Sequence, residues 1–546
     1  MSPIRRRIIR DYVIAALSLA AIYGVYVLVI SPRREFPLGD DFAYAQTVRH
    51  LVNTGELRLS EWTSTSLIGQ VYWGALFTHL LGGFSFTALR WSTLVISLVG
   101  CLSLYDLLRQ LDLTAPAALF GALTLAVNPV FMYFSYTFMS DVFYISLMLL
   151  CLAFYARGVK HNAGWALLIG SLVASAAYLV RQLGVMLPLA AAAAVLLRDR
   201  KLHGKRVLLI GAVPALVFIG HTLWLRYVHG LPWGMELNTL ARTQSYLRDP
   251  TFLLQTVLRL PVVVLYLGAF TLPVLLAQCA SLSADRARPI RLAKLCGIWF
   301  AVLAILLAAV TVLTGSPLTY FGELIVRLGT GWIRLPGQPI PIVPTWALHA
   351  MTIMALMVGA MPGALWTDAL FLARRQQPPA VTLLLSSLLM MALTAGLGLL
   401  YDRYVLAFAP ATLYLGLKLW TIKPRGWVMG VTACVVFGVY GLVTVGDFFL
   451  WRTAFWSTAE QLVAQGVPPA AIDAGFEWIG WHEFETNLPR AIAEGKGNDL
   501  WGWLYVTPKP YRIAYEPLEG YVILERVPYR TPVLGRIGDI YVLQTR

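Results

Sequence analysis

The sequence predicts a polytopic α-helical membrane protein with a small mixed α/β domain at its C-terminal end. Of its 546 residues, 58% are hydrophobic and only 13% are charged, whereas soluble domains carry about 25% charged residues. Long apolar runs also recur up to residue 446, and a helix needs roughly 20 apolar residues to cross the hydrocarbon. Residues 1–446 are therefore predicted to form the membrane domain.

Thirteen membrane-spanning helices are predicted in this region. Their ranges are 11–30, 88–108, 114–133, 139–156, 163–180, 183–197, 206–226, 253–278, 295–314, 346–366, 380–400, 404–420 and 427–446. The apolar stretch 67–81 is short and aromatic, which favours a re-entrant or interfacial segment within a first outer loop, 31–87.

The Lys and Arg residues predict the orientation. They gather at the N-terminus and in four later segments, 198–206, 285–294, 373–375 and 423–425. With thirteen spans all five stretches lie on one side, and basic loops are typically cytoplasmic. The net charge of +15 then reflects topology and not nucleic-acid binding. The sequence has no N-x-Ser/Thr sequon, which favours a bacterial plasma membrane.

The polar residues 447–546 are predicted to form the extracytoplasmic domain. A helical stretch at 456–481 precedes four β-like runs, which are punctuated by Pro and Gly. These runs are 501–506, 511–516, 520–529 and 537–544. The pattern favours a small α/β domain.

Ionisable residues gather at the predicted outer ends of the spans. Asp40 and Asp41 follow the first span, and Asp141 opens the fourth. Arg181 and Arg403 lie at the outer turns between spans five and six and between spans eleven and twelve. Ionisable groups near a membrane are costly, so those retained tend to be functional or paired. Their common side predicts one site at the outer membrane boundary.

Each of these residues also has a structural explanation. Apolar residues repeat at helical spacing after Asp40, so its carboxylate is suited to cap an amphipathic helix. Asp141 is suited to the first turn of a helix, where the dipole stabilises an acid. Arg181 and Arg403 are suited to reach the head groups of lipids. The functional interpretation depends on all of these residues lying together at the outer ends of the predicted spans.

The chemistry of this set suits group transfer. A carboxylate beside a membrane can act as a general base or bind a metal ion, and arginines bind phosphate through paired hydrogen bonds. No nucleotide-binding motif appears in a soluble segment. We therefore expect an activated donor that the membrane delivers as a lipid phosphate, without nucleotide or nucleic acid.

Five stretches also carry a resemblance to a known family. They are "LGDDFAYAQTVRHLVNTGEL", "GQVYWGALFTHLLGGFSFTALRWSTLVISLVGCLSLYDLLRQL", "FGALTLAVNPVFMYFSYTFMSDVFYISLMLLCLAFYARG", "YLVRQLGVMLPLAAAAAVLL" and "YDRYVLAFAPATLYLGL". In order and spacing the chain resembles the GT-C glycosyltransferases of the protein O-mannosyltransferase and aminoarabinose-transferase type, glycosyltransferase family 39. The resemblance covers most of residues 1–446 and is clearest in the first two hundred.

The resemblance implies an integral-membrane inverting glycosyltransferase. It would move a sugar from a polyprenyl-phosphate donor to a hydroxyl or phosphate of a lipid, glycan or protein acceptor. Asp41 is favoured over its neighbour Asp40 as the catalytic base, and Asp141 would orient the acceptor or a metal ion. The second acid of the first-loop pair is Asp here, where Glu is commoner in the family.

The resemblance also implies the substrate-binding residues. Arg181 and Arg403 would bind the donor phosphate, and Tyr404 and Tyr72 would complete the binding set. Many relatives carry a Lys- or His-Pro-Pro ahead of the aromatic pair that matches Tyr72-Trp73, and this chain lacks it. If a divalent cation such as Mg²⁺ or Mn²⁺ is used, Asp40 and Asp141 would be its ligands.

Two other functions remain open at this level. A lipid or glycolipid transporter or flippase would carry inverted repeats and broken or charged helices near the midplane, and the acids here sit at helix ends. A non-catalytic scaffold would bind lipid-linked glycans. The loops 227–250 and 315–345 are expected to roof the site. Glu477, Trp478 and Trp481 either contact an acceptor or pack in the core of the C-terminal domain.

Overall fold

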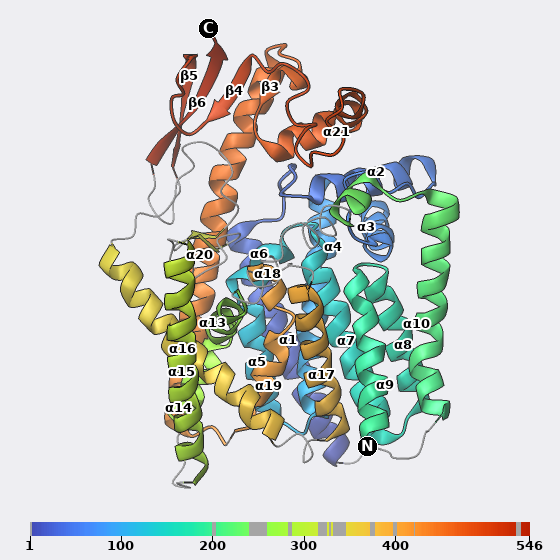
Figure 1. Cartoon of the computed structure of the whole chain (residues 1–546), viewed down its shortest axis with the longest axis vertical. Coiled ribbons are helices and arrows are strands. Elements are labelled where there is room, and N and C mark those ends of the chain that lie inside the picture. The colour runs from blue at the N-terminus through green and yellow to red at the C-terminus, as the bar shows by residue number, and fades with distance from the viewer. Residues whose placement is uncertain are drawn as a thin grey trace.

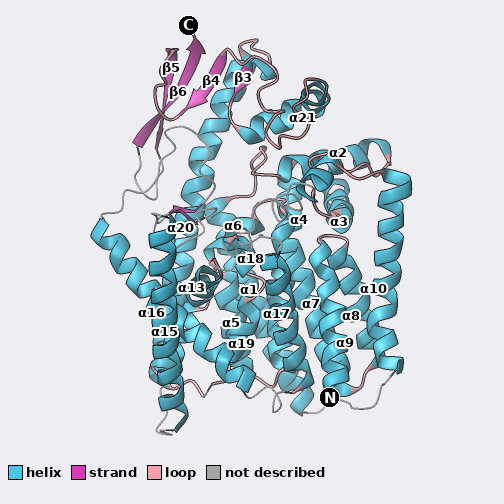
Figure 2. Ribbon diagram, viewed as in Figure 1, coloured by secondary structure: helices cyan, strands magenta, loops and turns pink. Residues whose placement is uncertain are grey.

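The computed structural model describes most of the chain. The described residues are 3–198, 204–239, 259–281, 287–314, 325–326, 329–330, 345–371, 377–396, 401–419, 421–530 and 537–546. Helices dominate them, and Figure 2 shows the larger sheet at one end of the molecule. The predicted fold class, a polytopic helical protein with a small C-terminal sheet domain, is confirmed. Of the predicted loops 227–250 and 315–345, residues 240–250 and most of 315–344 lie outside the described residues.

Eight helices among the described residues are long and apolar enough to cross a membrane, or up to ten if each of two bent pairs is one span. The eight are α1 (Pro3–Ile30), α4 (Phe86–Gln110), α7 (Ser140–His161), α10 (Gly204–Trp224, continued by the π-helical turn η2, Leu225–His229), α15 (Ala287–Thr314), α16 (Thr345–Phe371), α17 (Pro378–Gly396) and α20 (Pro424–Ala464). The chain is therefore a multi-pass membrane protein.

Bent and short helices account for the difference from thirteen predicted spans. Predicted span 114–133 is α5 (Ala115–Ala126) and α6 (Pro129–Ser135), bent by 66°. Much of predicted span 253–278 is α13 (Leu260–Phe270) and α14 (Leu272–Cys279), bent by 70°; residues 253–258 lie outside the described part. Predicted span 163–180 is the shorter helix α8 (Gly164–Tyr178), and predicted span 183–197 is the 3-10 turn η1 (Gln182–Val185) followed by α9 (Met186–Arg198). Predicted span 404–420 begins in α18 (Asp402–Val405) and continues in α19 (Ala409–Leu417).

The first helix shows how the bundle packs. Its buried residues recur every three or four positions and so form one stripe; they are Ala15, Leu19, Tyr23, Tyr26 and Ile30. This stripe faces α4, α5 and α20. On its other side Leu17 and Leu28 are 66% and 84% exposed, as expected for a surface in contact with lipid.

Two helices lie at the end of the bundle that carries the C-terminal domain, here called the domain end (Figure 1). The first, α2 (Asp41–Thr54), buries Phe42, Ala45 and Val48, which confirms the predicted amphipathic helix. The second, α3 (Ile68–Leu80), corresponds to the predicted segment 67–81. Its 13 residues are too few to span the hydrocarbon.

Helix α20 continues without a break through residue 446, the predicted domain boundary, and leads into the C-terminal domain (Figure 1). There the elements are η4 (Pro469–Ala471), β3 (Ile472–Asp473), α21 (Phe476–Ala493), β4 (Tyr511–Ala514), β5 (Tyr521–Arg530) and β6 (Ile537–Thr545). The sheet order is β3-β4-β6-β5, with β3 parallel to β4 and the other pairs antiparallel. A separate hairpin joins β1 (Ile325–Val326) and β2 (Gly329–Thr330).

One predicted strand is wrong. Residues 501–506 form turns and not a strand, because Trp503 is fully buried against Phe476 and Phe484 of α21. The fourth strand of the sheet is instead the two-residue β3, which is too short to leave a period-2 pattern in the sequence.

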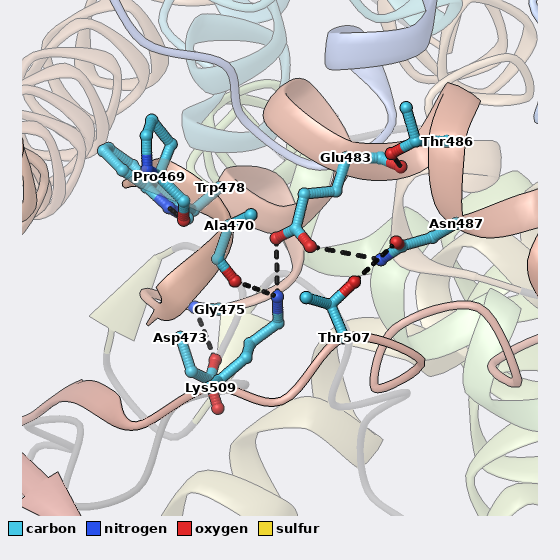
Figure 3. A network of polar contacts seen from close by, with 10 residues as sticks. All are labelled: Pro469, Ala470, Asp473, Gly475, Trp478, Glu483, Thr486, Asn487, Thr507 and Lys509. Carbon is cyan, nitrogen blue, oxygen red and sulfur yellow. Dashed lines mark hydrogen bonds and ion pairs between the residues drawn. The ribbon is translucent and has the colours of Figure 1, made fainter. Parts of the chain in front are cut away.

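A buried polar network fixes α21 within the domain (Figure 3). Lys509 lies 2.5 Å from Glu483 and donates to the carbonyl of Ala470 at 3.2 Å. Glu483 also accepts from Asn487 at 3.3 Å, and Asn487 accepts from Thr507 at 3.0 Å. Thr507 and Lys509 belong to the segment that leads into β4, and Glu483 and Asn487 belong to α21. The network therefore holds α21 against that segment.

Candidate active site

The two adjacent aspartates have different environments. Gly39 adopts a φ of +63°, which suits glycine, and α2 begins at Asp41. Asp40 occupies the cap position, but within this described turn its side chain makes no capping hydrogen bond. It is partly exposed and accepts a 3.0 Å hydrogen bond from the indole nitrogen of Trp62. Asp40 therefore holds the predicted N-cap position, but its carboxylate does not cap the helix.

Asp41 is buried, with 1% of its surface exposed. Its Oδ1 accepts from the backbone N–H of Leu38 at 2.5 Å, and its Oδ2 accepts from that of Phe138 at 3.2 Å. Burial raises the pKa of Asp41 to about 8, although Arg90 and the two backbone N–H groups act in the opposite direction. Asp41 thus joins the first loop to the segment before α7.

Asp141 brings two guanidinium groups together. Its Oδ1 lies 3.0 Å from Arg181 and 3.8 Å from Arg403. Arg181 follows α8 and also donates to the hydroxyl of Ser140 at 2.9 Å, which fixes it at the start of α7. Arg403 lies in α18. Two arginines from distant parts of the chain therefore contact the same carboxylate. Three of the predicted site residues are therefore in direct contact.

Tyr404 completes this group. The guanidinium carbon of Arg181 lies 5.0 Å from the centre of its ring, and that of Arg403 lies 5.3 Å away. Both distances are within the range of cation–π attraction. A small cavity of about 10 Å³ lies beside the group, and its wall includes Asp141, Arg181, Arg403 and Tyr404 together with apolar residues such as Met390 and Phe408.

Tyr44 connects this group to Asp40. Burial raises the pKa of the Tyr44 phenol. The charges of Asp40 and Asp141 raise it further, and those of Arg181 and Arg403 lower it. All four charges therefore act on one phenol, and Asp40 lies about one helical turn before it in the chain. The predicted convergence is thus present for Asp141, Arg181 and Arg403, which are in contact, and Asp40 is related to them through its effect on Tyr44.

No contact among the described residues joins two of the predicted residues, Asp41 and Tyr72, to this group. Asp41 faces Arg90 and Glu477. Tyr72 is 54% exposed on α3, and none of the contacts among described residues joins it to the Asp141 group.

The predicted metal ligands do not fit a divalent cation. Asp141 already faces two guanidinium groups, and Asp40 accepts from Trp62. Among the described residues, no three His, Cys, Asp or Glu side chains are placed to hold an ion together. We therefore assign no step to a metal ion.

Arg90 is a site residue that the sequence analysis missed. It is 1% exposed and donates to the carbonyls of Arg34, Phe36 and Tyr136, the last two at 2.6 and 3.1 Å. It therefore ties the loop before Asp40 to the segment before α7. The sequence did contain a signal for this residue: Arg90 stands within the apolar stretch 86–94, and a charge near the end of a span needs a partner.

Glu477 and Arg452 form a second contact that the sequence analysis missed. The two side chains, 7% and 5% exposed, lie 3.1 Å apart, and Glu477 also accepts from the N–H of Gly39 at 3.2 Å. The contact joins α20 and α21 to the loop that carries Asp40. Glu477 was a candidate acceptor contact, and its burial assigns it to packing instead. Trp478 is likewise buried, at 1% exposed.

A comparison with protein families bears on this arrangement. The family model described as "Dolichyl-phosphate-mannose-protein mannosyltransferase" matches residues 70–224. The predicted resemblance to GT-C glycosyltransferases is supported. The matched range contains Asp141 and Arg181 but neither Asp40 nor Arg403. No curated protein matches the chain.

Several solved structures are similar at low identity. The archaeal oligosaccharyltransferase AglB from Archaeoglobus fulgidus, in complex with an inhibitory peptide and a dolichol-phosphate, is 13% identical over 97% of this chain and 74% of its own, with a TM-score of 0.49. ArnT from Cupriavidus metallidurans, bound to undecaprenyl phosphate, is 14% identical over 97% of both chains, with a TM-score of 0.43. The S. cerevisiae Pmt1-Pmt2 complex bound to the sugar donor is 14% identical over 40% of this chain and 33% of its own, with a TM-score of 0.32.

Proposed function

We propose that this protein is an inverting membrane glycosyltransferase that moves a sugar from a polyprenyl-phosphate donor to an acceptor hydroxyl or phosphate. The observation that carries the proposal is the pair of arginines, Arg181 and Arg403, on the single carboxylate of Asp141. Two guanidinium groups at one place suit the phosphate of a lipid-linked donor, because each can donate two parallel hydrogen bonds. The family match over residues 70–224 supports the same activity.

Asp40 is the better candidate for the catalytic base. Its carboxylate is partly exposed and oriented by Trp62, so an acceptor can reach it. Both carboxylate oxygens of Asp41 already accept backbone hydrogen bonds in a buried position. The proposal thus moves the role of base, which the resemblance favoured for Asp41, to Asp40 and makes Asp41 the residue that positions the loop.

In the proposed reaction an acceptor hydroxyl attacks the anomeric carbon while Asp40 takes its proton. The bond from the anomeric carbon to the phosphate oxygen breaks, and its electron pair remains on the polyprenyl phosphate. Arg181 and Arg403 stabilise the negative charge that develops on this leaving group. Asp141 holds the two guanidinium groups in place before the donor arrives, which lowers the cost of organising the site.

We further propose that the N-terminus is cytoplasmic and that the site faces the outside of a bacterial plasma membrane. The basic residues of the N-terminal and loop segments support this orientation. Outside the cytoplasm a lipid-linked donor replaces a nucleotide sugar, in agreement with the absence of nucleotide-binding motifs from the sequence.

The test compares Asp40→Asn with Asp41→Asn in lipid nanodiscs, with radiolabelled polyprenyl-phosphate sugars as donors and the lipids and glycans of the host envelope as acceptors. We expect transfer by the wild type and a loss of about 10²- to 10⁴-fold in Asp40→Asn, the usual contribution of a general base. Asp41→Asn should keep more activity than Asp40→Asn.

Two results would contradict the proposal. Transfer near the wild-type level in Asp40→Asn would exclude that residue as the base. Movement of a labelled lipid across the bilayer, with no transfer from any donor, would favour the transporter instead. Melting temperatures of both variants serve as the control for folding.

A further inference from the structure

A large groove lies at the end of the bundle opposite the domain end, where the N-terminus also lies (Figure 1). It has a volume of about 610 Å³ and runs between α1 and α7, and α4, on which both helices pack, forms its floor. Most of its lining side chains are aliphatic, and the exceptions are Tyr12, Ser103, Asp106, Phe154 and Arg157. This hollow, called the α1–α7 groove below, shares no lining residue with the cavity of the candidate active site.

The groove opens toward the lipid and extends within one leaflet. On α1, Ile8, Ile9 and Val13 line it and are 44–49% exposed. The lining residues of α4 fall within 99–106 and those of α7 within 150–157, which is about 10 Å along each helix at 1.5 Å per residue. One leaflet of the hydrocarbon core is roughly 15 Å deep. The groove therefore has the length and the apolar surface that suit part of one acyl chain.

The polar part of the wall is an ion pair with unused donors. Asp106 lies 2.9 Å from Arg157 and also accepts from Gln110 at 3.1 Å and from Tyr12. Arg157 donates through Nη2 alone in the hydrogen bonds of the described residues, and its side chain is 32% exposed. Its Nε and Nη1 groups can therefore donate to a ligand in the groove, whereas both oxygens of Asp106 already have partners.

Further positive charge stands at the outer end of the groove. Arg5 is exposed and lies three and four residues before Ile8 and Ile9, so it is on the same face of α1 as these lining residues. Arg7 is also exposed, but it lies about 160° around the helix from Arg5 and is therefore on another face. Pockets between membrane-spanning helices that carry basic residues on the cytoplasmic side bind the anionic head groups of lipids. Arg5 and Arg157 give the groove this character.

The acids near the groove favour an anionic head group over a zwitterionic one. The ammonium group of a zwitterionic lipid needs a carboxylate that has no other cation. The described acids of α1, of α4 and of the turn after α4 are each paired already: Asp11 with Arg10 at 3.6 Å, Asp106 with Arg157 at 2.9 Å and Asp112 with Lys160 at 2.5 Å. The charge that remains for a head group is therefore positive.

We propose that the α1–α7 groove binds an anionic phospholipid of the cytoplasmic leaflet. One acyl chain would lie along the apolar lining, and the phosphate would accept hydrogen bonds from Arg157 and Arg5. This inference does not rest on glycosyl transfer, and it takes only the name of the leaflet from the proposed orientation. Since α1 is only 28% buried along its apolar stretch, the bound lipid would also stabilise α1 against α4 and α7.

Native mass spectrometry of the full-length protein in detergent tests this site. The protein is titrated with phosphatidylglycerol and, separately, with phosphatidylethanolamine that has the same acyl chains. Because the two lipids differ in net charge and not in their chains, a difference in Kd reports the head group. We expect the first phosphatidylglycerol to bind at least about fivefold more tightly, the usual effect of one charge near a basic residue at a membrane surface.

Two variants, each with a matched control on α1, locate the bound lipid. Arg5→Gln should weaken phosphatidylglycerol binding about fivefold, whereas Arg7→Gln, which removes the same charge on another face, should change it less than about twofold. Ala16→Phe places a ring in the groove and should weaken binding at least about tenfold, since each methylene kept out of the groove costs about fourfold in affinity. Its control, Leu17→Phe, adds a ring on the exposed side and should leave the Kd unchanged.

Several results would overturn the assignment. Equal affinity for the two lipids would mean contact with surrounding lipid alone, and equal effects of Arg5→Gln and Arg7→Gln, or an unchanged Kd in Ala16→Phe, would place the bound lipid elsewhere. A protein dimer without bound lipid that Ala16→Phe dissociates would assign the groove to a second copy of the chain. If melting temperatures show that Ala16→Phe fails to fold, the two arginine variants decide alone. Sugar transfer is measured separately, so failure of either proposal leaves the other standing.

Discussion

Neighbouring residues of the same type can have different functions when their side chains enter different environments. Asp40 and Asp41 are adjacent, yet one is partly exposed and the other is 1% exposed. The helix that starts at Asp41 turns successive side chains by about 100°, which separates the two carboxylates. The buried acid joins backbone segments, and the exposed one remains available to a substrate.

The protonation of Asp41 should make stability depend on pH. Burial raises its pKa from 3.8 to about 8, so the folded chain binds this proton more tightly than the unfolded chain. The stabilising contribution is complete below about pH 4 and is lost as the pH rises through about 8. We expect the melting temperature of wild type minus that of Asp41→Asn to fall from pH 5 to pH 9 by at least roughly 1 °C, corresponding to about 1 kcal/mol in a chain of this length.

An exposed carboxylate provides the control for this measurement. Asp499 lies in an exposed turn of the C-terminal domain, and Asp499→Asn should leave the pH dependence of the melting temperature unchanged. Parallel curves for wild type and Asp41→Asn over the whole range would contradict the assignment of a raised pKa.

Part of the candidate site could be predicted from the residue types and from the side of the membrane on which each residue lies. Asp141, Arg181 and Arg403 each stand at the end of an apolar run, so their common level followed from topology. The division of roles between Asp40 and Asp41 could not be predicted, because it depends on partners 22 and 97 residues away in the chain, at Trp62 and Phe138. Glu477 was identifiable only as a polar residue of the C-terminal domain, since its partners Gly39 and Arg452 come from other segments.

At the scale of elements, α20 connects the membrane domain, the C-terminal domain and the loop that carries Asp40. Its 41 residues include a predicted span and the first part of the C-terminal domain, so a single helix connects the two. Arg452, within this helix, pairs with Glu477, which in turn binds the backbone of Gly39. The angular position of α20 thereby affects the loop that carries Asp40.

A single-residue insertion in α20 should disturb this connection. One alanine added after Gly446 would turn the following residues by about 100° and shift them by about 1.5 Å, which moves Arg452 away from Glu477. A buried charge left without its partner costs about 3–5 kcal/mol. We expect a lower melting temperature and at least a tenfold loss of transfer. One alanine inserted after Gly495, in an exposed turn, should have little effect, and equal effects of the two insertions would contradict the role of α20.

The elements were predicted well where one apolar run forms one straight helix. Hydropathy could not reveal the bend of 66° between α5 and α6, because the residues on both sides are apolar. Asn128 produces the break: its side chain caps α6 by accepting from the N–H groups of Val130 and Phe131 at 3.0 and 3.2 Å. Asn followed by Pro was the local signal for this helix start.

At the scale of the whole molecule, the C-terminal domain and the membrane domain share one core. Trp62 of the first loop contacts the rings of Phe476, Phe484 and Trp503 at 5.4–5.8 Å between centroids. Phe42 of α2 packs on Gly480, where an added Cβ would come within 2.7 Å of the ring. The predicted boundary at residue 446 is therefore a change in composition and not a physical separation.

The proposed orientation predicts which surfaces are accessible from outside the cell. Lys496 is exposed at the domain end, and Lys205 is exposed at the start of α10, near the opposite end (Figure 1). We expect a membrane-impermeant maleimide to label Lys496→Cys in intact cells and Lys205→Cys only after lysis. The unsubstituted chain, which has five native cysteines, is the control. The reverse pattern would place the Asp141 group on the cytoplasmic side and remove the reason for a lipid-linked donor.

The shared carboxylate of Asp141 has a consequence for biosynthesis. Its partner Arg181 is close in the chain, but Arg403 belongs to a segment that a ribosome makes only after most of the protein has entered the bilayer. A nascent chain would therefore hold one cation against Asp141 and would lack the second until about three quarters of the chain had been made. Catalytic competence would appear late and all at once, so an interrupted translation product would be inert rather than partly active.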